Sequence, residues 1–99
     1  MNIKITSRKF RAKDSLKNFI KEEIKSAEKF YDDILDVDVI LSYTKLEDSI
    51  KTAEIIAQIP GKTLSVSHSS DDFEKSVSAA VEKLIRQLKK VKTQRIARK

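Results

Sequence analysis

Residues 53–67 read AEIIAQIPGKTLSVS, and this stretch decides the fold because it holds two alternating apolar runs joined by a turn. The alternating apolar residues are Ala53, Ile55, Ala57 and Ile59 before the turn, and Leu64 and Val66 after it. A period of two places successive side chains on opposite faces of a strand. Pro60-Gly61 between the runs is a strong turn signal. The stretch therefore predicts two antiparallel strands that share one apolar face.

Two further strands are predicted upstream of this hairpin. Ile3 and Ile5 alternate with polar residues in a short first strand. A longer alternating run holds Val37, Val39, Leu41 and Tyr43. A turn at Glu47-Asp48-Ser49 is expected to connect that run to the hairpin.

A helix is predicted between residues 14 and 31. Its apolar residues recur at three- and four-residue steps, the period of an amphipathic helix. They are Leu16, Phe19, Ile20, Ile24, Ala27 and the pair Phe30/Tyr31. Asp14 or Ser15 is expected to cap the first turn.

A second helix follows the last strand. Asp71 and Glu74 have the spacing of a capping box. The apolar stripe then consists of Phe73, Val77, Ala80, Val81, Leu84, Leu88 and Val91. No helix breaker follows, so the helix is expected to fray through Thr93 into a flexible basic tail, residues 94–99.

The element order is β-α-β-β-β-α, and 99 residues suffice for one domain. We therefore predict an α+β two-layer sandwich over residues 1–93, with a four-stranded mixed sheet and two helices on one face. The order contains that of a double-stranded-RNA-binding domain. Asp71-Asp72 at the start of the last helix would repel a phosphate, so duplex reading is disfavoured although the fold is related.

Composition argues against an enzyme or a metal protein. The chain has no Cys and one His, His68, so a zinc site is not expected. One Gly cannot build a phosphate loop or a dinucleotide fingerprint, and no cofactor is implied. The paired Asp residues fall at predicted turns and caps, so no catalytic residue is assigned. The chain shows no signal peptide and no membrane-spanning run, which predicts a cytoplasmic protein.

Charge is segregated along the chain. Residues 1–21 carry seven Lys/Arg and one acid, and residues 22–82 carry six basic and fourteen acidic side chains. Residues 83–99 carry eight basic residues and no acid. Such segregation indicates an oriented partner with a large negative field, and nucleic acid is the commonest one in a cytoplasm.

The second helix supplies the first candidate nucleic-acid contacts. At 100° per residue, Lys83, Arg86 and Lys90 fall within roughly 60° of one another, opposite the apolar stripe. Lys89 and Lys92 extend the positive region. A solvated face is the alternative, but solvation alone does not require the exclusion of Glu, so phosphate contact is favoured.

The N-terminal third supplies a second set of candidates: Arg8, Lys9, Arg11, Lys13, Lys17, Lys21 and Lys25. A solvated loop and an RNA contact are equally compatible with the residues before the first helix. Together with the second helix they are expected to form one continuous basic groove. The few aromatics mostly fall in core registers, so the protein is expected to recognise shape and phosphates rather than bases.

The second helix also carries a family resemblance. DFEKSV at residues 72–77 and EKLIRQLKKVK at residues 82–92 resemble the last helix of the ribosome hibernation-promoting factor family, which includes ribosome-associated inhibitor A. The K-L-x-R-Q-L core, residues 83–88, is the most specific part, and the similarity covers essentially the whole chain. The resemblance is to the short form, without the second domain by which long members pair ribosomes.

This resemblance implies a non-enzymatic partner of the small ribosomal subunit. Family members bind between its head and body, compete with mRNA and tRNA at the A and P sites, and silence ribosomes in stationary phase or stress. By resemblance, Lys83, Arg86, Lys90 and Lys92 would contact rRNA phosphates. The free protein is expected to be a monomer, and a separate ribosome-dimerising factor is a further candidate partner. The alternatives are a general RNA-binding or RNA-chaperone domain, and a basic module for anionic membranes or an acidic protein.

Overall fold

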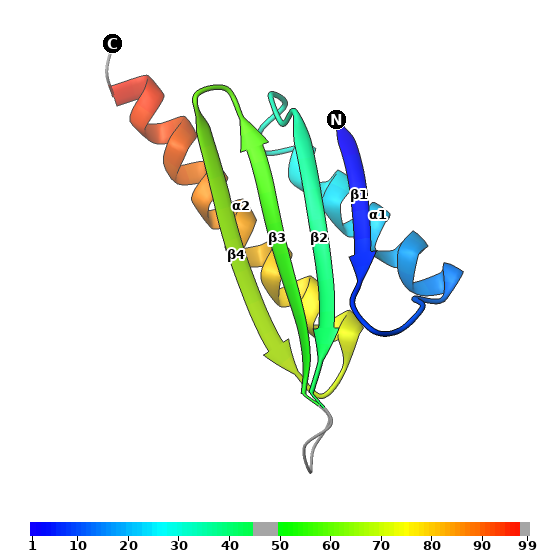
Figure 1. The fold of residues 1–99 in the computed structure, drawn as a ribbon. Coiled ribbons are helices and arrows are strands. Elements are labelled where there is room, and N and C mark those ends of the chain that lie inside the picture. The colour runs from blue at the N-terminus through cyan, green and yellow to red at the C-terminus, as the bar shows by residue number, and fades with distance from the viewer. Residues whose placement is uncertain (45–49, 98–99) are drawn as a thin grey trace.

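The computed structural model describes residues 1–44 and 50–97, with side chains as far as residue 93. The described residues form six elements in the predicted order (Figure 1). Their bounds are β1 Asn2–Ser7, α1 Asp14–Glu28, β2 Asp36–Tyr43, β3 Lys51–Ile59, β4 Lys62–Ser70 and α2 Phe73–Ala97. The turn predicted at residues 47–49 lies outside the described residues.

The strands form one sheet in the order β1-β2-β3-β4. β1 and β2 are parallel, because α1 crosses over the sheet between them, whereas β2, β3 and β4 are antiparallel. Ile55 of β3 lies opposite Val39 of β2 and Val66 of β4. This register puts the apolar side chains of neighbouring strands on one face. The predicted mixed sheet in an α+β sandwich is confirmed.

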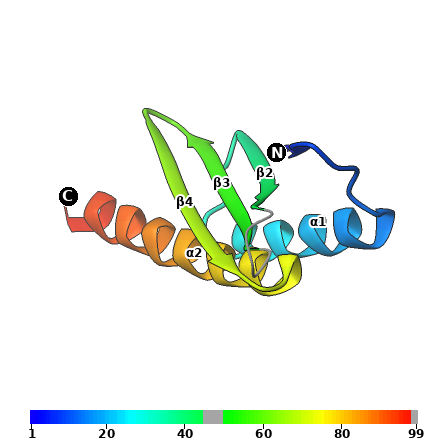
Figure 2. The ribbon, with the colours of Figure 1, turned by 60° about the horizontal axis from the view of Figure 1, so that its bottom comes forward.

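The core lies between this face and the two helices, which cover the same side of the sheet (Figure 2). Its helical side chains include Ile20, Ile24, Val77, Leu84 and Leu88, all fully buried. Burial of each such side chain contributes about 1.5–3 kcal/mol, and in a 99-residue domain that is a large fraction of the total stability. The opposite face carries polar side chains such as the exposed Asp36 and Asp38 of β2.

The hairpin between β3 and β4 turns at Pro60-Gly61, as predicted. Ile59 pairs with Lys62, so the connection is only two residues long. Gly61 has a φ of 74°, in the left-handed region where a Cβ is unfavourable. A type II turn requires a positive φ at its second central position and often has Pro at the first, which is the pattern seen here.

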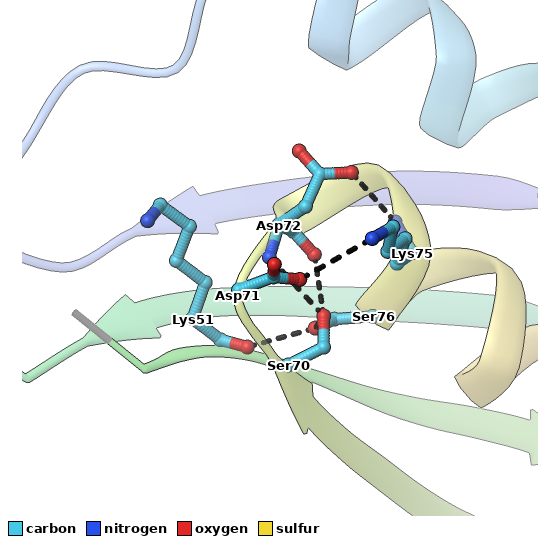
Figure 3. Close-up of polar contacts among 6 residues, drawn as sticks. All are labelled: Lys51, Ser70, Asp71, Asp72, Lys75 and Ser76. Atoms are coloured by element: carbon cyan, nitrogen blue, oxygen red, sulfur yellow. Dashed lines mark hydrogen bonds and ion pairs between the residues drawn. The ribbon is translucent and has the colours of Figure 1, made fainter. Parts of the chain in front are cut away.

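The start of α2 is tied to two strands by a network of side chains (Figure 3). The Ser76 hydroxyl is fully buried, donates to the carbonyl oxygen of Lys51 at 2.8 Å and lies 2.7 Å from the Ser70 hydroxyl. The backbone N–H of Lys75 donates to Asp72 Oδ2 at 3.1 Å. Asp72 therefore caps the helix.

The predicted helix ends need four corrections. Asp72 rather than Asp71 caps α2, because β4 continues to Ser70 and the helix begins at Phe73. The residue three positions after Asp72 is Lys75, so the predicted capping box with Glu74 is wrong. The N-cap of α1 is Lys13, without a side-chain cap bond, so neither Asp14 nor Ser15 has that role. α1 ends at Glu28, before the end predicted at residue 31. α2 continues to Ala97, beyond the fraying point expected at residue 93.

Candidate nucleic-acid interface

The second half of α2 presents exposed basic side chains on several consecutive turns. Arg86, Lys89, Lys90 and Lys92 are all exposed, and no acidic residue follows Glu82 in the sequence. Among the described residues, none of these four side chains takes part in an ion pair. This stretch is therefore suited to contact a polyanion.

Lys83 differs from these neighbours because it is half-buried against the sheet. Its Nζ donates to the carbonyl oxygen of Ser67 in β4 at 2.8 Å. The expectation that Lys83 lies opposite the apolar stripe is therefore wrong. β4 is an edge strand, so its carbonyl groups lack a strand partner on that side, and a lysine on the helix flank can reach one of them. An ammonium group has three donors, and two remain for a phosphate oxygen.

The connection from β1 to α1 forms a second basic region that is anchored by an aromatic side chain. The Phe10 ring stacks on Phe73 at 5.1 Å between centroids and meets Tyr43 edge-on at 5.5 Å. The flanking basic side chains are exposed: Arg8, Lys9, Arg11 and Lys13. The N–H of Arg8 also donates to the carbonyl oxygen of Leu41 at 2.9 Å. The loop is thus held in place while its charges face solvent.

The backbone of this loop is strained at one residue. Lys9 has a φ of 65°, the left-handed region that costs a residue with a Cβ about 1–2 kcal/mol. We expect Lys9→Gly to raise the free energy of unfolding by about 0.5–1 kcal/mol, since relief of strain exceeds the entropy that glycine adds to the unfolded chain. Urea denaturation measures the change. Lys9→Ala removes the same charge but keeps the strain, so equal stability of the two variants would contradict the prediction.

The lysines of α1 form a third region, separate from the basic half of α2. Glu23 of α1 accepts a hydrogen bond from the Ser78 hydroxyl of α2 at 2.6 Å, so this flank of α1 faces α2. At 100° per residue, Lys17 and Lys21 lie on the other flank. The Phe10 loop packs on Phe73 in the first turn of α2, roughly 15–30 Å along the helix from its basic residues. The structure thus divides the single groove expected from the sequence into three regions.

An aromatic side chain also lies at the basic face, which sequence reasoning missed. Lys89 Nζ is 4.7 Å above the ring centroid of Phe30, within the range of a cation–π interaction. Phe30 is exposed whereas Tyr31 is buried, so only the second of this pair belongs to the apolar stripe. The sequence spacing could have predicted this, because steps of four, three and four residues lead from Ile20 to Tyr31 and leave Phe30 outside the apolar stripe.

The described part of the chain offers little for other chemistry. Within it, no three His, Asp or Glu side chains gather where they could hold a metal ion. His68 is half-buried at the end of β4, and Asp32 and Asp33 are exposed after α1. No helix in these residues has the length and apolar character needed to cross a lipid bilayer.

Comparison with known families places the chain. The model of the Sigma 54 modulation protein / S30EA ribosomal protein family matches residues 3–96, which cover the six described elements apart from Asn2 and Ala97. The chain belongs to this family. The match confirms the resemblance seen in the second helix.

Named relatives agree with this assignment. The ribosome hibernation promoting factor of Pseudomonas putida is 29% identical over 93% of this chain and 87% of its own. The protein of the same name from Azotobacter vinelandii is 28% identical over 99% and 89%.

Solved structures share the fold over nearly the whole chain. A ribosomal subunit interface protein from Coxiella burnetii has a TM-score of 0.86 and 26% identity, covering 94% of this chain and 99% of that one. The N-terminal domain of Protein Y from Thermus thermophilus has a TM-score of 0.82 and 25% identity, covering 92% and 99%.

Proposed function

We propose that this protein is a ribosome hibernation factor that binds the small ribosomal subunit in the cytoplasm and blocks translation in stationary phase or stress. It occupies the channel used by mRNA and by the A- and P-site tRNAs. The mechanism is steric and electrostatic competition, so no bond is made or broken. The observation that carries the proposal is the acid-free basic half of α2 in a chain of this family.

The names of the relatives support the proposal. The curated relatives are called ribosome hibernation promoting factors, and one structural relative is called a ribosomal subunit interface protein. The sequence identities are 29%, 28% and 26%, over most of each chain. On this basis residues 1–93 act as one ribosome-binding domain. A separate ribosome-dimerising factor is a further candidate partner, and the free protein would be a monomer.

The distribution of charge supports a concave partner. The three basic regions are the exposed half of α2, the loop around Phe10 and the outer flank of α1. The first two lie roughly 15–30 Å apart along α2, and the third lies on the flank of α1 away from α2, so the regions do not form one continuous stripe along a straight duplex. A channel walled by rRNA surrounds its occupant and presents phosphates on several sides. This geometry favours the ribosome over generic duplex RNA, with Lys83 as an additional contact beside β4.

Co-sedimentation with purified small ribosomal subunits across a salt series tests the proposal. The variant Arg86→Gln/Lys90→Gln/Lys92→Gln removes three exposed cations and leaves Lys83 bonded to β4. Each lost phosphate contact is worth about 1 kcal/mol, so affinity should fall roughly a hundredfold at low salt. The slope of log affinity against log salt should become shallower by about 2–3.

A matched control separates the interface from net charge. Lys4→Glu/Lys75→Gln also lowers the formal charge from +6 to +3, at two exposed lysines outside the proposed contacts. This control should bind nearly as the wild type does. An equal loss of affinity in both variants would show that the basic half of α2 is not the binding site. If the wild type binds small ribosomal subunits no more tightly than it binds generic duplex RNA, only a general RNA-binding or RNA-chaperone role would remain.

A further inference from the structure

Phe30 is a large apolar side chain at the surface, in the turn that ends α1. It remains 36% exposed, whereas the adjacent Tyr31 is 6% exposed. The N–H groups of both residues donate to the carbonyl oxygen of Ala27, at 3.0 and 3.2 Å. These bonds close the end of α1. They also determine which of the two rings enters the core.

The exposed ring borders the basic half of α2. The Nζ of Lys89 lies 4.7 Å above its centroid, and the Lys89 side chain is itself exposed. One π-face of Phe30 therefore lies under a cation of the basic face, and both side chains are exposed. Arg86 and Lys90 are exposed on the neighbouring positions of the same helix. An RNA strand that meets these charges would therefore pass next to the ring.

Exposed apolar residues are common and usually need no explanation. Met1, Leu35 and Ile50 are also exposed, at 39%, 50% and 47%. Phe30 differs from them because it is aromatic, because the turn after α1 holds it, and because a cation of the basic face lies over its ring. Aromatic rings beside cations are the elements with which proteins bind single-stranded nucleic acid.

We propose that Phe30 is a stacking site for an unpaired nucleobase of the bound RNA. The base takes the place of Lys89 over the ring, and the released ammonium group pairs with a phosphate of the same strand. The inference rests on the proposed function, since it adds a base contact to that interface. Stacking of this kind is sequence-tolerant, because every base has a π-face. The contact would distinguish single-stranded RNA from a duplex whose bases are already stacked.

Tryptophan fluorescence gives a direct test, because the chain contains no Trp. Phe30→Trp should be quenched by small ribosomal subunits and by a single-stranded RNA oligonucleotide of mixed sequence. Heparin, a polyanion without bases, should leave the emission unchanged. Phe30→Leu should bind small subunits about tenfold more weakly, with an unchanged salt slope because no charge is lost.

Ile50→Trp is the control, at a similarly exposed position. Ile50 is far from Phe30, because the two residues lie beyond opposite ends of β2. Phe30 precedes this strand, which is about 26 Å long, and the carbonyl oxygen of Ile50 accepts a hydrogen bond from Thr44 just after it. Equal quenching at both positions, quenching by heparin, or full affinity of Phe30→Leu would overturn the stacking site. If small subunits fail to bind while the oligonucleotide still quenches Phe30→Trp, the proposed function fails and the stacking site stands.

Discussion

Addition of the protein to a purified translation system should reduce initiation, and excess mRNA with initiator tRNA should restore it. Competition for one channel predicts this reciprocity, because each ligand lowers the apparent affinity of the other. Arg86→Glu/Lys90→Glu/Lys92→Glu should require roughly a thousandfold more protein for the same inhibition. The loss of three phosphate contacts accounts for about two orders of magnitude, and repulsion by the new carboxylates adds to it. Synthesis of a reporter protein measures the effect.

Charge reversal also changes the helix, so folding has to be verified. Circular dichroism of the reversed variant should match that of the wild type, because all three residues are exposed. Lys4→Glu/Lys75→Glu reverses two charges outside the proposed contacts and should still inhibit. Inhibition that mRNA and tRNA fail to relieve would place the protein outside their channel.

Leu84→Ala should lower the free energy of unfolding by about 3–5 kcal/mol. Leu84 is fully buried in the single core between the sheet and the helices. Its truncation removes apolar contacts and leaves a cavity that a small domain cannot fill by relaxation. Since domains of this size have about 5–15 kcal/mol in total, the variant should retain only a part of its stability. Urea denaturation with an unchanged m-value is the measurement.

The same substitution at an exposed leucine provides the comparison. Leu35 is 50% exposed in the connection before β2, and Leu35→Ala should change stability by less than about 0.5 kcal/mol. Similar losses at both positions would mean that burial in the described core does not determine the stability of this fold.

Much of the fold was predictable from periodicity. Ala53, Ile55 and Val66 alternate as the pleat of a strand requires, and the structure buries all three. The spacing of Leu84 and Leu88 predicted the buried stripe of α2 in the same way. The helix ends were harder, because a cap depends on where the preceding strand stops. β4 continues to Ser70, and for this reason Asp72 rather than Asp71 caps α2.

The candidate interface was only partly predictable. The exposed positions of Arg86 and Lys90 follow from the helical period of α2. Lys83 lies on the flank of α2 next to β4, and its Nζ bonds to a carbonyl group of that strand. Its surroundings therefore depend on a different part of the chain. The exposure of Phe30 likewise depends on the backbone bonds that end α1. Side chains at the border of an apolar stripe are therefore the ones that periodicity assigns least well.

By itself, the sequence determined the element order, the apolar faces, the segregation of charge and the family, because each depends on residues close together in the chain. Only the tertiary structure decided which distant groups meet. It brought Phe10 onto Phe73, Lys83 onto the carbonyl group of Ser67 and Lys89 onto the ring of Phe30. The physical reason is that a local repeat sets the direction of a side chain relative to its own helix or strand. The partner that it meets there depends on how the helices pack on the sheet.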